Sequence, residues 1–332
     1  MVGPPAAVAA VRLAVRQALA DAGVCDQRVV VGCSGGADSL ALAAGLAHEM
    51  SRGPGQAFAL IVDHGLQDSS AQVAQQAARQ CAELGIEQTQ IASVTVERTE
   101  AGLEADARAS RYAALSRYAA DIGASAVLVG HTQDDQAESV LLGLARGSGA
   151  NALAGMPAAR DLIPDDPSSP QLLRPLLSVP KLTTAQCCAD LGIAAWQDPH
   201  NADQRFARVR AREAIVTLDA QLGPGIGAAL ARSASLLRTD TEALDEWAKT
   251  AYAELGEQPW GVTDLLALPA AIRMRCWQRA AHAFGSAPGA LTSTHLGEID
   301  RLLVDWHGQG PINLPGGVQA QRKHSAVWLE AP

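Results

Sequence analysis

The feature that most constrains this chain is the glycine-rich segment Ser34-Gly35-Gly36-Ala37-Asp38-Ser39, which directly follows the short β-branched run 28–33. A buried strand that opens through two glycines onto a helix makes a phosphate-binding turn. Glycine lets backbone N–H groups approach the oxygens, and a helix N-terminus carries partial positive charge. Ser34 and Ser39 can donate hydroxyl hydrogen bonds, whereas Asp38 would repel a bare phosphate and therefore indicates a bound Mg²⁺. An ordinary capped turn is the alternative, but the full hexapeptide between a strand and a helix favours the phosphate site.

The segments around this loop alternate between apolar runs and helical patterns. We expect strands over 28–33, 57–62, 86–92 and 125–129, and helices over 6–22, 38–50, 69–84, 103–121 and 133–145. This alternation predicts an α/β fold with a doubly wound, mainly parallel, Rossmann-like sheet covered by helices on both faces. Ligands bind such sheets at the carboxyl ends of the strands. The glycine-rich loop, Asp63-His64-Gly65 and Gly130-His131-Thr132 all follow predicted strand ends, so they converge on one rim.

The length of 332 residues is typical of two domains. Gly223-Pro224-Gly225 interrupts the pattern, and a long helix over 226–255 follows. We therefore expect a catalytic domain over 1–222 and a smaller helical or α+β domain over 223–332. Within the first domain, Asp161–Pro170 is predicted to be a loop.

Composition narrows the class of protein. Hydrophobic residues make up 48% of the chain, and no apolar run of membrane-spanning length or signal peptide is evident. A cytoplasmic protein that does not bind membranes is expected, and a homodimer is among the assemblies that the sequence leaves open. The six cysteines form no C-x-x-C pair, which favours buried, reduced thiols over a zinc or redox site. The net charge of −9 argues against non-specific nucleic-acid binding, so contact with RNA would need a local basic patch.

Three acidic residues, Asp134, Asp135 and Glu138, lie within little more than one turn of a predicted helix. Spacings of three and four place them on one side, where like charges are costly unless a cation lies among them. That cation is either Mg²⁺ or the ammonium group of an amino-acid substrate. The alternative is a solvated acidic first turn favoured by the helix dipole. Their place on the same rim as the phosphate loop favours a functional role.

Other polar residues on this rim remain ambiguous from the residues alone. His131 can contact phosphate or ribose, or cap its helix, and His64 ranks below it. Asp63 is either a ligand contact at its strand end or a plain turn residue. Arg108 and Arg111 share a helix face and can stabilise charge on a phosphate ligand or pair with the acidic residues, although an ion pair between Arg108 and Glu104 explains the first adequately.

The densest basic run comprises four arginines in eight residues: Arg205, Arg208, Arg210 and Arg212. Such a run forms a track for RNA phosphates, or a solvated face balanced by nearby acidic residues, and the residues leave the two interpretations equal. A second, weaker candidate patch comprises Arg273, Arg275 and Arg279.

The hexapeptide resembles the loop of the PP-loop ATP pyrophosphatase superfamily, whose members cleave ATP between the α- and β-phosphates. Further stretches are similar to the signatures of one family in it, the tRNA(Ile)-lysidine synthetases. These are Leu103–Arg108 with Arg111-Tyr112, Gly130–Gly149, Arg174–Leu177, Asp198–Asp203, the 205–212 arginines, Trp306–Gly310 and Leu314–Gly317. One departure is Arg208-Val209, where the family often has Arg-Asn.

The resemblance implies a reaction in which the wobble cytidine of a tRNA(Ile) with a CAU anticodon is adenylated and then joined to L-lysine, with ATP and Mg²⁺ required. It implies catalytic roles for Asp38, Arg108, Arg111 and Asp135, with Asp38 also holding the metal. ATP contacts are expected from Ser34–Ser39, Asp63 and His131. Lysine is expected at Asp134, Asp135 and Glu138, and tRNA along the 205–212 arginines.

Three rival functions fit the sequence less well. A PP-loop tRNA thiolase would need reactive cysteines, usually in C-x-x-C pairs, or an iron–sulfur cluster, and Cys187-Cys188 does not supply that spacing. A glutamine-dependent amidotransferase would need an amidase domain that is not evident. An RNA-binding protein without catalysis is disfavoured by the intact phosphate loop.

Overall fold

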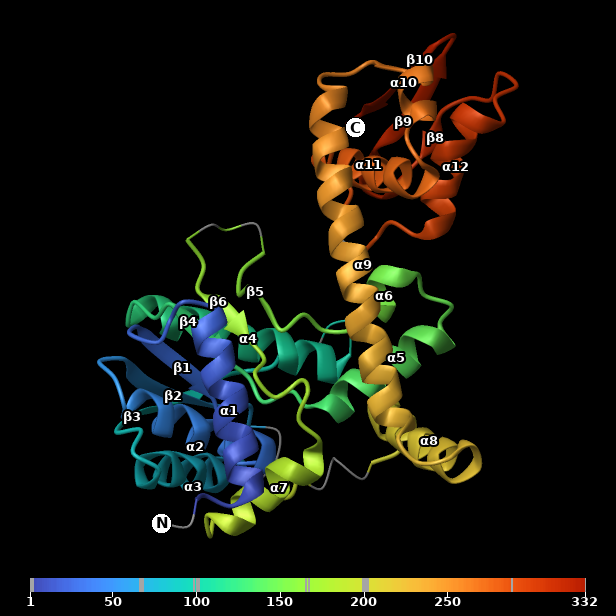
Figure 1. Cartoon of the computed structure of the whole chain (residues 1–332). Coiled ribbons are helices and arrows are strands. Elements are labelled where there is room, and N and C mark those ends of the chain that lie inside the picture. The colour runs from blue at the N-terminus through green and yellow to red at the C-terminus, as the bar shows by residue number, and fades with distance from the viewer. Residues whose placement is uncertain are drawn as a thin grey trace. The chain divides into compact units, whose positions relative to one another are not determined.

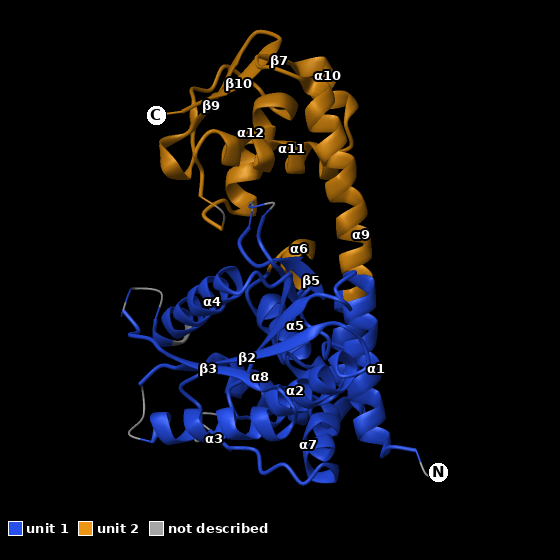
Figure 2. Ribbon diagram, turned by 90° about the vertical axis from the view of Figure 1, so that its left-hand side faces the viewer, with its two compact units in different colours: residues 1–147, 155–234 blue, residues 148–154, 235–332 orange. Residues whose placement is uncertain are grey.

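The computed structural model of the chain describes residues 3–65, 69–97, 99, 102–164, 166, 168–198, 203–287 and 289–331. Residues 199–202 of the 198–203 motif and the side chain of Glu104 lie outside the described residues, so the predicted Arg108–Glu104 ion pair stays a prediction. The chain divides into two compact units, one of residues 1–147 and 155–234 and the other of residues 148–154 and 235–332 (Figure 2).

The first unit is built on a six-stranded sheet with the strand order β3-β2-β1-β4-β6-β5. Its members are β1 (Arg28–Gly32), β2 (Gln56–Asp63), β3 (Gln88–Ser93), β4 (Ala126–Leu128), β5 (Ala159–Asp161) and β6 (Gln171–Leu173). All neighbouring pairs are parallel except β5–β6. The mainly parallel sheet confirms the predicted fold class.

Helices cover both faces of this sheet, as Figure 1 shows. Val29 and Val31 of β1 pack into one buried cluster with α1, α2, α3 and α7, whereas Val30 between them packs into another with α4. This alternation follows from the two-residue period of a strand buried on both sides. The helices of the unit are α1 (Ala6–Asp21), α2 (Ala37–Met50), α3 (Ser70–Glu83), α4 (Leu103–Asp121), α5 (Gln133–Ala145), α7 (Lys181–Asp190) and α8 (Ala207–Leu222).

Two strands were not predicted from the sequence. β5 and β6 have three residues each and flank the predicted loop Asp161–Pro170. Three residues are too few to show the alternation by which a strand is recognised. β6 nevertheless pairs in parallel with β4 and, with β5 on its other side, extends the sheet.

The second unit combines helices with a small antiparallel sheet of order β7-β10-β9-β8, which confirms the expected α+β character. Its buried core includes Trp260, Trp277 and Val327. Its elements are α6 (Ala150–Leu153), most of α9 (Ile226–Leu255), β7 (Trp260–Gly261), α10 (Val262–Ala267), α11 (Ala270–Ala283), α12 (Ser293–Val304), β8 (Ile312–Asn313), the 3-10 turn Pro315–Gly317, β9 (Gln319–Lys323) and β10 (Ala326–Glu330).

The two units are divided between Ala234 and Ser235, inside the continuous helix α9. The predicted domain boundary after residue 222 lies instead between α8 and α9, and it stays a prediction. Among the described residues no single helix has the length and apolar character to span a membrane, although the bent pair α8 and α9 meets both criteria together.

Candidate active site

The phosphate loop is shaped by the hydroxyl of Ser39. Its Oγ donates to Gly36 O at 2.9 Å and accepts from Ser34 N at 3.1 Å, while Ser34 Oγ lies 3.3 Å away. The side chain of Ser39 is buried, so this hydroxyl holds the loop in its turn. Ser34 is the hydroxyl that remains at the loop surface for a ligand.

The two glycines of the loop have different structural roles: Gly35 adopts a left-handed backbone conformation, and Gly36 leaves space at the start of α2. Gly35 has a φ of +81°, which side chains rarely adopt, and a Cβ there would lie 3.3 Å from Ala77 Cβ. Its carbonyl accepts a hydrogen bond from Trp196 N at 2.9 Å. A Cβ on Gly36 would meet only Ser34 Oγ at 3.6 Å, and helix α2 has no side-chain cap there. The first-turn N–H groups of α2 therefore face open space that suits an anion.

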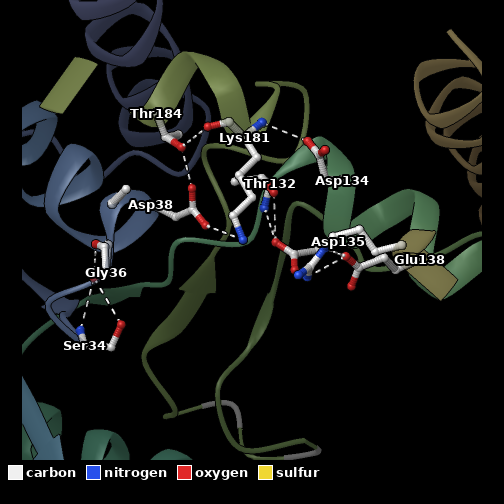
Figure 3. Close-up of polar contacts among 12 residues, drawn as sticks. Ser34, Gly36, Asp38, Thr132, Asp134, Asp135, Glu138, Lys181 and Thr184 are labelled. Atoms are coloured by element: carbon white, nitrogen blue, oxygen red, sulfur yellow. Dashed lines mark hydrogen bonds and ion pairs between the residues drawn. The ribbon is translucent and has the colours of Figure 1, made fainter. Parts of the chain in front are cut away.

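Asp38 stands in the first turn of α2 and contacts α7. One carboxylate oxygen lies against the hydroxyl of Thr184, and the other is 3.8 Å from Lys181 Nζ (Figure 3). Burial raises the pKa of Asp38, with Thr184 and Lys181 opposing the rise and Asp134 and Asp135 adding to it. The site therefore places several carboxylates close enough to repel one another, which a bound cation would relieve.

The starts of α2, α5 and α7 meet at this rim because each helix follows a parallel strand of the sheet. A Cβ on Gly130, just after β4, would lie 3.1 Å from backbone atoms of Asp38 and Ser39, so only glycine allows this approach. Asp134 Oδ2 accepts from Lys181 N at 2.8 Å and thus ties α5 to α7. The positive ends of three helices consequently point into one site.

The acidic residues of α5 are each engaged by groups of this chain. Asp135 Oδ2 accepts from the Thr132 backbone N–H at 2.7 Å in a capping box, and its Oδ1 lies 4.0 Å from Arg208 Nη1. Glu138 Oε1 accepts from Arg212 Nε at 2.8 Å. Glu138 is almost fully buried, and burial raises its pKa while Arg212 opposes the rise. Its Oε2 is buried and has no hydrogen-bond partner among the described residues.

Mg²⁺ fits this site as a metal shared with a nucleotide. No group of three or more His, Cys, Asp or Glu residues suited to a metal occurs in the described part of the chain. Proteins commonly hold Mg²⁺ with one or two carboxylates and substrate phosphates instead. The carboxylate of Asp38, beside the phosphate loop, has the chemistry for that role.

Three arginines and a tyrosine lie near the acidic residues of α5. Arg108 Nη2 donates to Tyr112 Oη at 3.4 Å, and its guanidinium lies 5.1 Å from the centre of that ring. Burial lowers the pKa of Arg111, and Arg108 and Arg208 lower it further. Arg174 of the R-P-L-L segment is also buried and donates to Pro157 O at 2.8 Å. Arg174 is buried and Arg108 and Arg111 are partly exposed, so the three guanidinium groups together suit an anionic ligand.

The histidines and Asp63 differ in their surroundings. Burial lowers the pKa of His131 to about 3, with Arg174, Arg108 and Arg111 adding to the fall and Asp135 opposing it. The Nδ1 atoms of His131 and His64 are buried without a hydrogen-bond partner among the described residues. Asp63 Oδ1 accepts from Gly65 N at 3.0 Å, which is the geometry of a turn residue.

The four arginines of the 205–212 run point in two directions. Arg208 and Arg212, four residues apart on α8, face the acidic residues of α5. Arg205 and Arg210 are exposed, the first paired with Asp203 and the second donating to Gln204 O and Arg205 O. Val209, where the family often has Asn, is buried. Only the exposed pair lies open to a large polyanion.

The second candidate patch is wrong as an open basic surface. Arg273 is buried and makes a two-pronged ion pair with Asp300. Arg275 Nε donates to Asp245 Oδ1 at 2.6 Å, and Arg279 Nη2 donates to Asp245 O at 3.3 Å. These arginines fasten helices of the second unit together.

Sequence reasoning missed three residues of the site, namely Thr132, Lys181 and Thr184. Thr132 carried a detectable signal, because Thr-x-x-Asp before an apolar run indicates an N-terminal cap. Lys181 and Thr184 lie 143 and 146 residues after Asp38 in the sequence. Only the placement of α7 beside α2 brings them there.

Comparison with known proteins first defines the class. The model of the PP-loop domain matches residues 9–218, so the first unit is a PP-loop domain of the ATP-binding kind. Among solved structures, the U34-tRNA thiolase NcsA from Methanococcus maripaludis superposes with a TM-score of 0.58 over 70% of this chain and 80% of its own. At 19% identity this likeness concerns the fold alone.

Curated relatives narrow the class to one family. The tRNA(Ile)-lysidine synthase of Thermobifida fusca is 46% identical over 100% of both chains. That of Streptomyces coelicolor is 45% identical over 97% of both, and that of Mycobacterium bovis is 42% identical over 95% of this chain and 93% of its own. The chain belongs to the tRNA(Ile)-lysidine synthase family, which confirms the resemblance found in its motifs.

Proposed function

We propose that this enzyme uses ATP to join L-lysine to C2 of the wobble cytidine of a tRNA(Ile) with a CAU anticodon. The observation that carries the proposal is the meeting of three helix N-termini and the phosphate loop beside Asp38, in a chain of this family. Such a site can bind a triphosphate and can also hold the pyrophosphate that leaves when the bond between the α- and β-phosphates is cleaved.

The reaction proceeds in two steps. In the first, the C2 oxygen of cytidine attacks the α-phosphorus of ATP, and pyrophosphate leaves. In the second, the ε-amine of lysine attacks C2, loses a proton, and displaces AMP together with the former C2 oxygen. The protein contributes orientation, charge neutralisation and the exclusion of water.

Each part of the site has a task in this scheme. The loop of Ser34–Ser39 and the α2 N-terminus hold the departing pyrophosphate. Asp38 would hold Mg²⁺, which when bound would supply positive charge to neutralise the phosphates. Arg108 and Arg111, both only partly exposed, face charge that develops on the α-phosphate. Asp63 and His131 border the nucleoside, with His131 neutral as its lowered pKa requires.

Lysine recognition is proposed at Asp134, Asp135 and Glu138. Two of these carboxylates are paired with Arg208 and Arg212. The substrate ammonium would therefore join an existing network of charges, sharing acceptors such as the unpartnered Oε2 of Glu138. Such shared networks bind a cation selectively because every member is already oriented.

The rest of the proposal concerns how the protein binds tRNA. The exposed Arg205 and Arg210 begin a path for tRNA phosphates, to which Arg208 and Arg212 are adjacent on α8. The anticodon base is single-stranded and can be turned into a pocket. We further propose residues 223–332 as a tRNA-binding domain and the cytoplasm as the compartment, and a homodimer stays a prediction to be measured by light scattering.

Stoichiometry tests the assignment. Purified protein is incubated with ATP, labelled lysine and the CAU tRNA, and AMP, pyrophosphate and tRNA-bound lysine are counted. We expect one of each per modified tRNA, and no transfer to a tRNA whose wobble base is uridine. Transfer of sulfur, or binding of tRNA without pyrophosphate release, would support the thiolase or the non-catalytic RNA-binding alternative instead.

A further inference from the structure

Lys181 places a further cation beside the phosphate loop. Its Nζ is 3.8 Å from Asp38 Oδ2, and 41% of its side chain is exposed. This separation is longer than a hydrogen bond, so the contact is a loose ion pair that costs little to break. In Figure 3 the side chain extends from the start of α7 toward Asp38.

The backbone of Lys181, rather than its side chain, fixes α7 in place. Its N–H donates to Asp134 Oδ2 at 2.8 Å. Its carbonyl lies 2.7 Å from the hydroxyl of Thr184, which also contacts Asp38. The first turn of α7 is thus fastened to both α2 and α5 without help from the ammonium group, which can change partners while the helix stays where it is.

The loop and Asp38 give that ammonium group a second partner. A triphosphate seated on the open side of Gly36 brings negative charge next to Asp38, whose own carboxylate would turn to Mg²⁺. Asp38 then no longer needs Lys181 for neutralisation, whereas the phosphates do. A lysine ammonium is a compact point charge on a flexible stem and commonly serves phosphate in this way.

We propose that Lys181 is a phosphate-binding residue, which exchanges Asp38 for the β- and γ-phosphates of ATP and stays with the pyrophosphate as it departs. The inference rests on the proposed function and adds a residue to it. Lys181 transfers no proton in this role. The bond that breaks joins the α-phosphorus to the bridging oxygen, and the charge left on pyrophosphate is what the ammonium group stabilises.

The competing interpretation makes Lys181 a placeholder that only neutralises Asp38 in the absence of nucleotide. The two differ in what removal of the charge does. If Lys181 binds phosphate, removing its charge weakens pyrophosphate binding and slows pyrophosphate formation. If Lys181 only neutralises Asp38, removing its charge leaves pyrophosphate binding and formation unchanged or improves them.

Three variants separate these outcomes: Lys181→Met removes the charge, Lys181→Arg retains it, and Lys249→Met is the control. Lys249 is an exposed lysine of α9 paired with Glu246. The first measurement is calorimetric binding of inorganic pyrophosphate with Mg²⁺ to the full chain. We expect about tenfold weaker binding in Lys181→Met, partial recovery in Lys181→Arg and no change in Lys249→Met, with equal melting temperatures throughout.

The second measurement is single-turnover pyrophosphate release from ATP and tRNA with lysine omitted, which isolates the first step. We expect a fall of about 10- to 100-fold in Lys181→Met and an unchanged KM for lysine in the complete reaction. Wild-type binding and release in Lys181→Met would overturn the inference, as would an equal loss in Lys181→Arg with a lowered melting temperature. Failure of the wild-type protein to release pyrophosphate would instead contradict the proposed function.

Discussion

At the residue scale, Asp38 is a carboxylate kept where the fold alone would disfavour its charge. Burial raises its pKa, and Asp134 and Asp135 raise it further. A raised carboxylate pKa means that the folded state binds the proton more tightly than the unfolded state. The free energy of unfolding therefore falls as the pH rises through the window above the usual aspartate pKa. Such a residue is retained for function rather than stability.

Replacing Asp38 with Asn is expected to separate these two effects. The amide can donate to Thr184, which still contacts Lys181 O, so the melting temperature at neutral pH should equal or exceed that of the wild type. Pyrophosphate release should fall by about 100-fold or more, because the proposed metal ligand is lost. Scanning calorimetry and a release assay measure the two. Surviving turnover would show that Asp38 does not hold the metal.

His131 supplies a prediction about acid stability. Its pKa is lowered to about 3, chiefly by burial, so the folded protein keeps this imidazole neutral where an unfolded chain would protonate it. The free energy of unfolding should be unaffected by this group at pH 7. It should then decrease as the pH falls below about 6.5, by up to about 1.4 kcal/mol per pH unit.

The check compares urea unfolding from pH 7 to pH 4 in the wild type and in His131→Gln. In His131→Gln the free energy of unfolding should decrease less with falling pH than in the wild type. His307→Gln, on the exposed 306–310 segment, serves as the matched control. Parallel pH profiles of His131→Gln and the wild type would rule out this role for His131.

At the scale of elements, the contact between α5 and α8 includes a charge pair with a buried carboxylate, Glu138, and a partly exposed arginine, Arg212. Glu138 is 2% exposed, and Arg212 Nη2 lies 2.7 Å from its Oε1. The sequence showed both residues but not their pairing, since the 205–212 arginines fit a solvated track equally well. Which arginines turn inward is decided by the packing of α8 on α5, which local spacing does not reveal.

Arg212→Ala should destabilise the fold by about 3 kcal/mol, because it leaves the Glu138 carboxylate buried without its partner. Adding Glu138→Gln should restore most of that loss, since the uncompensated charge is removed. Arg205→Ala, in an exposed pair, should change stability by no more than about 0.5 kcal/mol. Denaturant unfolding measures all three, and strictly additive single effects would contradict a direct coupling.

Sequence periodicity predicts the long helices better than the short strands. The helices 103–121, 133–145 and 226–255 begin and end where the periodicity predicted. β5 and β6 were missed because three residues carry no period, and their place in the sheet comes from pairing with β4 and with each other. The rim itself was predictable, because strand ends of a parallel sheet meet at one edge. The position of α7 beside α2 could not be predicted from the sequence, so the roles of Lys181 and Thr184 could not be predicted either.

At the scale of the whole molecule, an acidic protein must bind a polyanion. The net charge of −9 makes binding depend on local arginines, and Arg205 and Arg210 are the exposed members of the basic run. Replacing either with Ala should weaken tRNA binding and lower the slope of log affinity against log salt by about one. Filter binding at several salt concentrations checks this. Arg16→Ala, at an exposed arginine paired with Glu49, is the control, and equal slopes in all proteins would contradict a phosphate track.

The central claim is that this site attaches lysine to one base of one tRNA. The most direct measurement is mass spectrometry of nucleosides from CAU tRNA after incubation with the enzyme, ATP and lysine. We predict that the wobble cytidine gains the mass of one lysine less one water, and only when ATP and lysine are both present. An unmodified wobble cytidine, or a product that forms without lysine, would contradict the account.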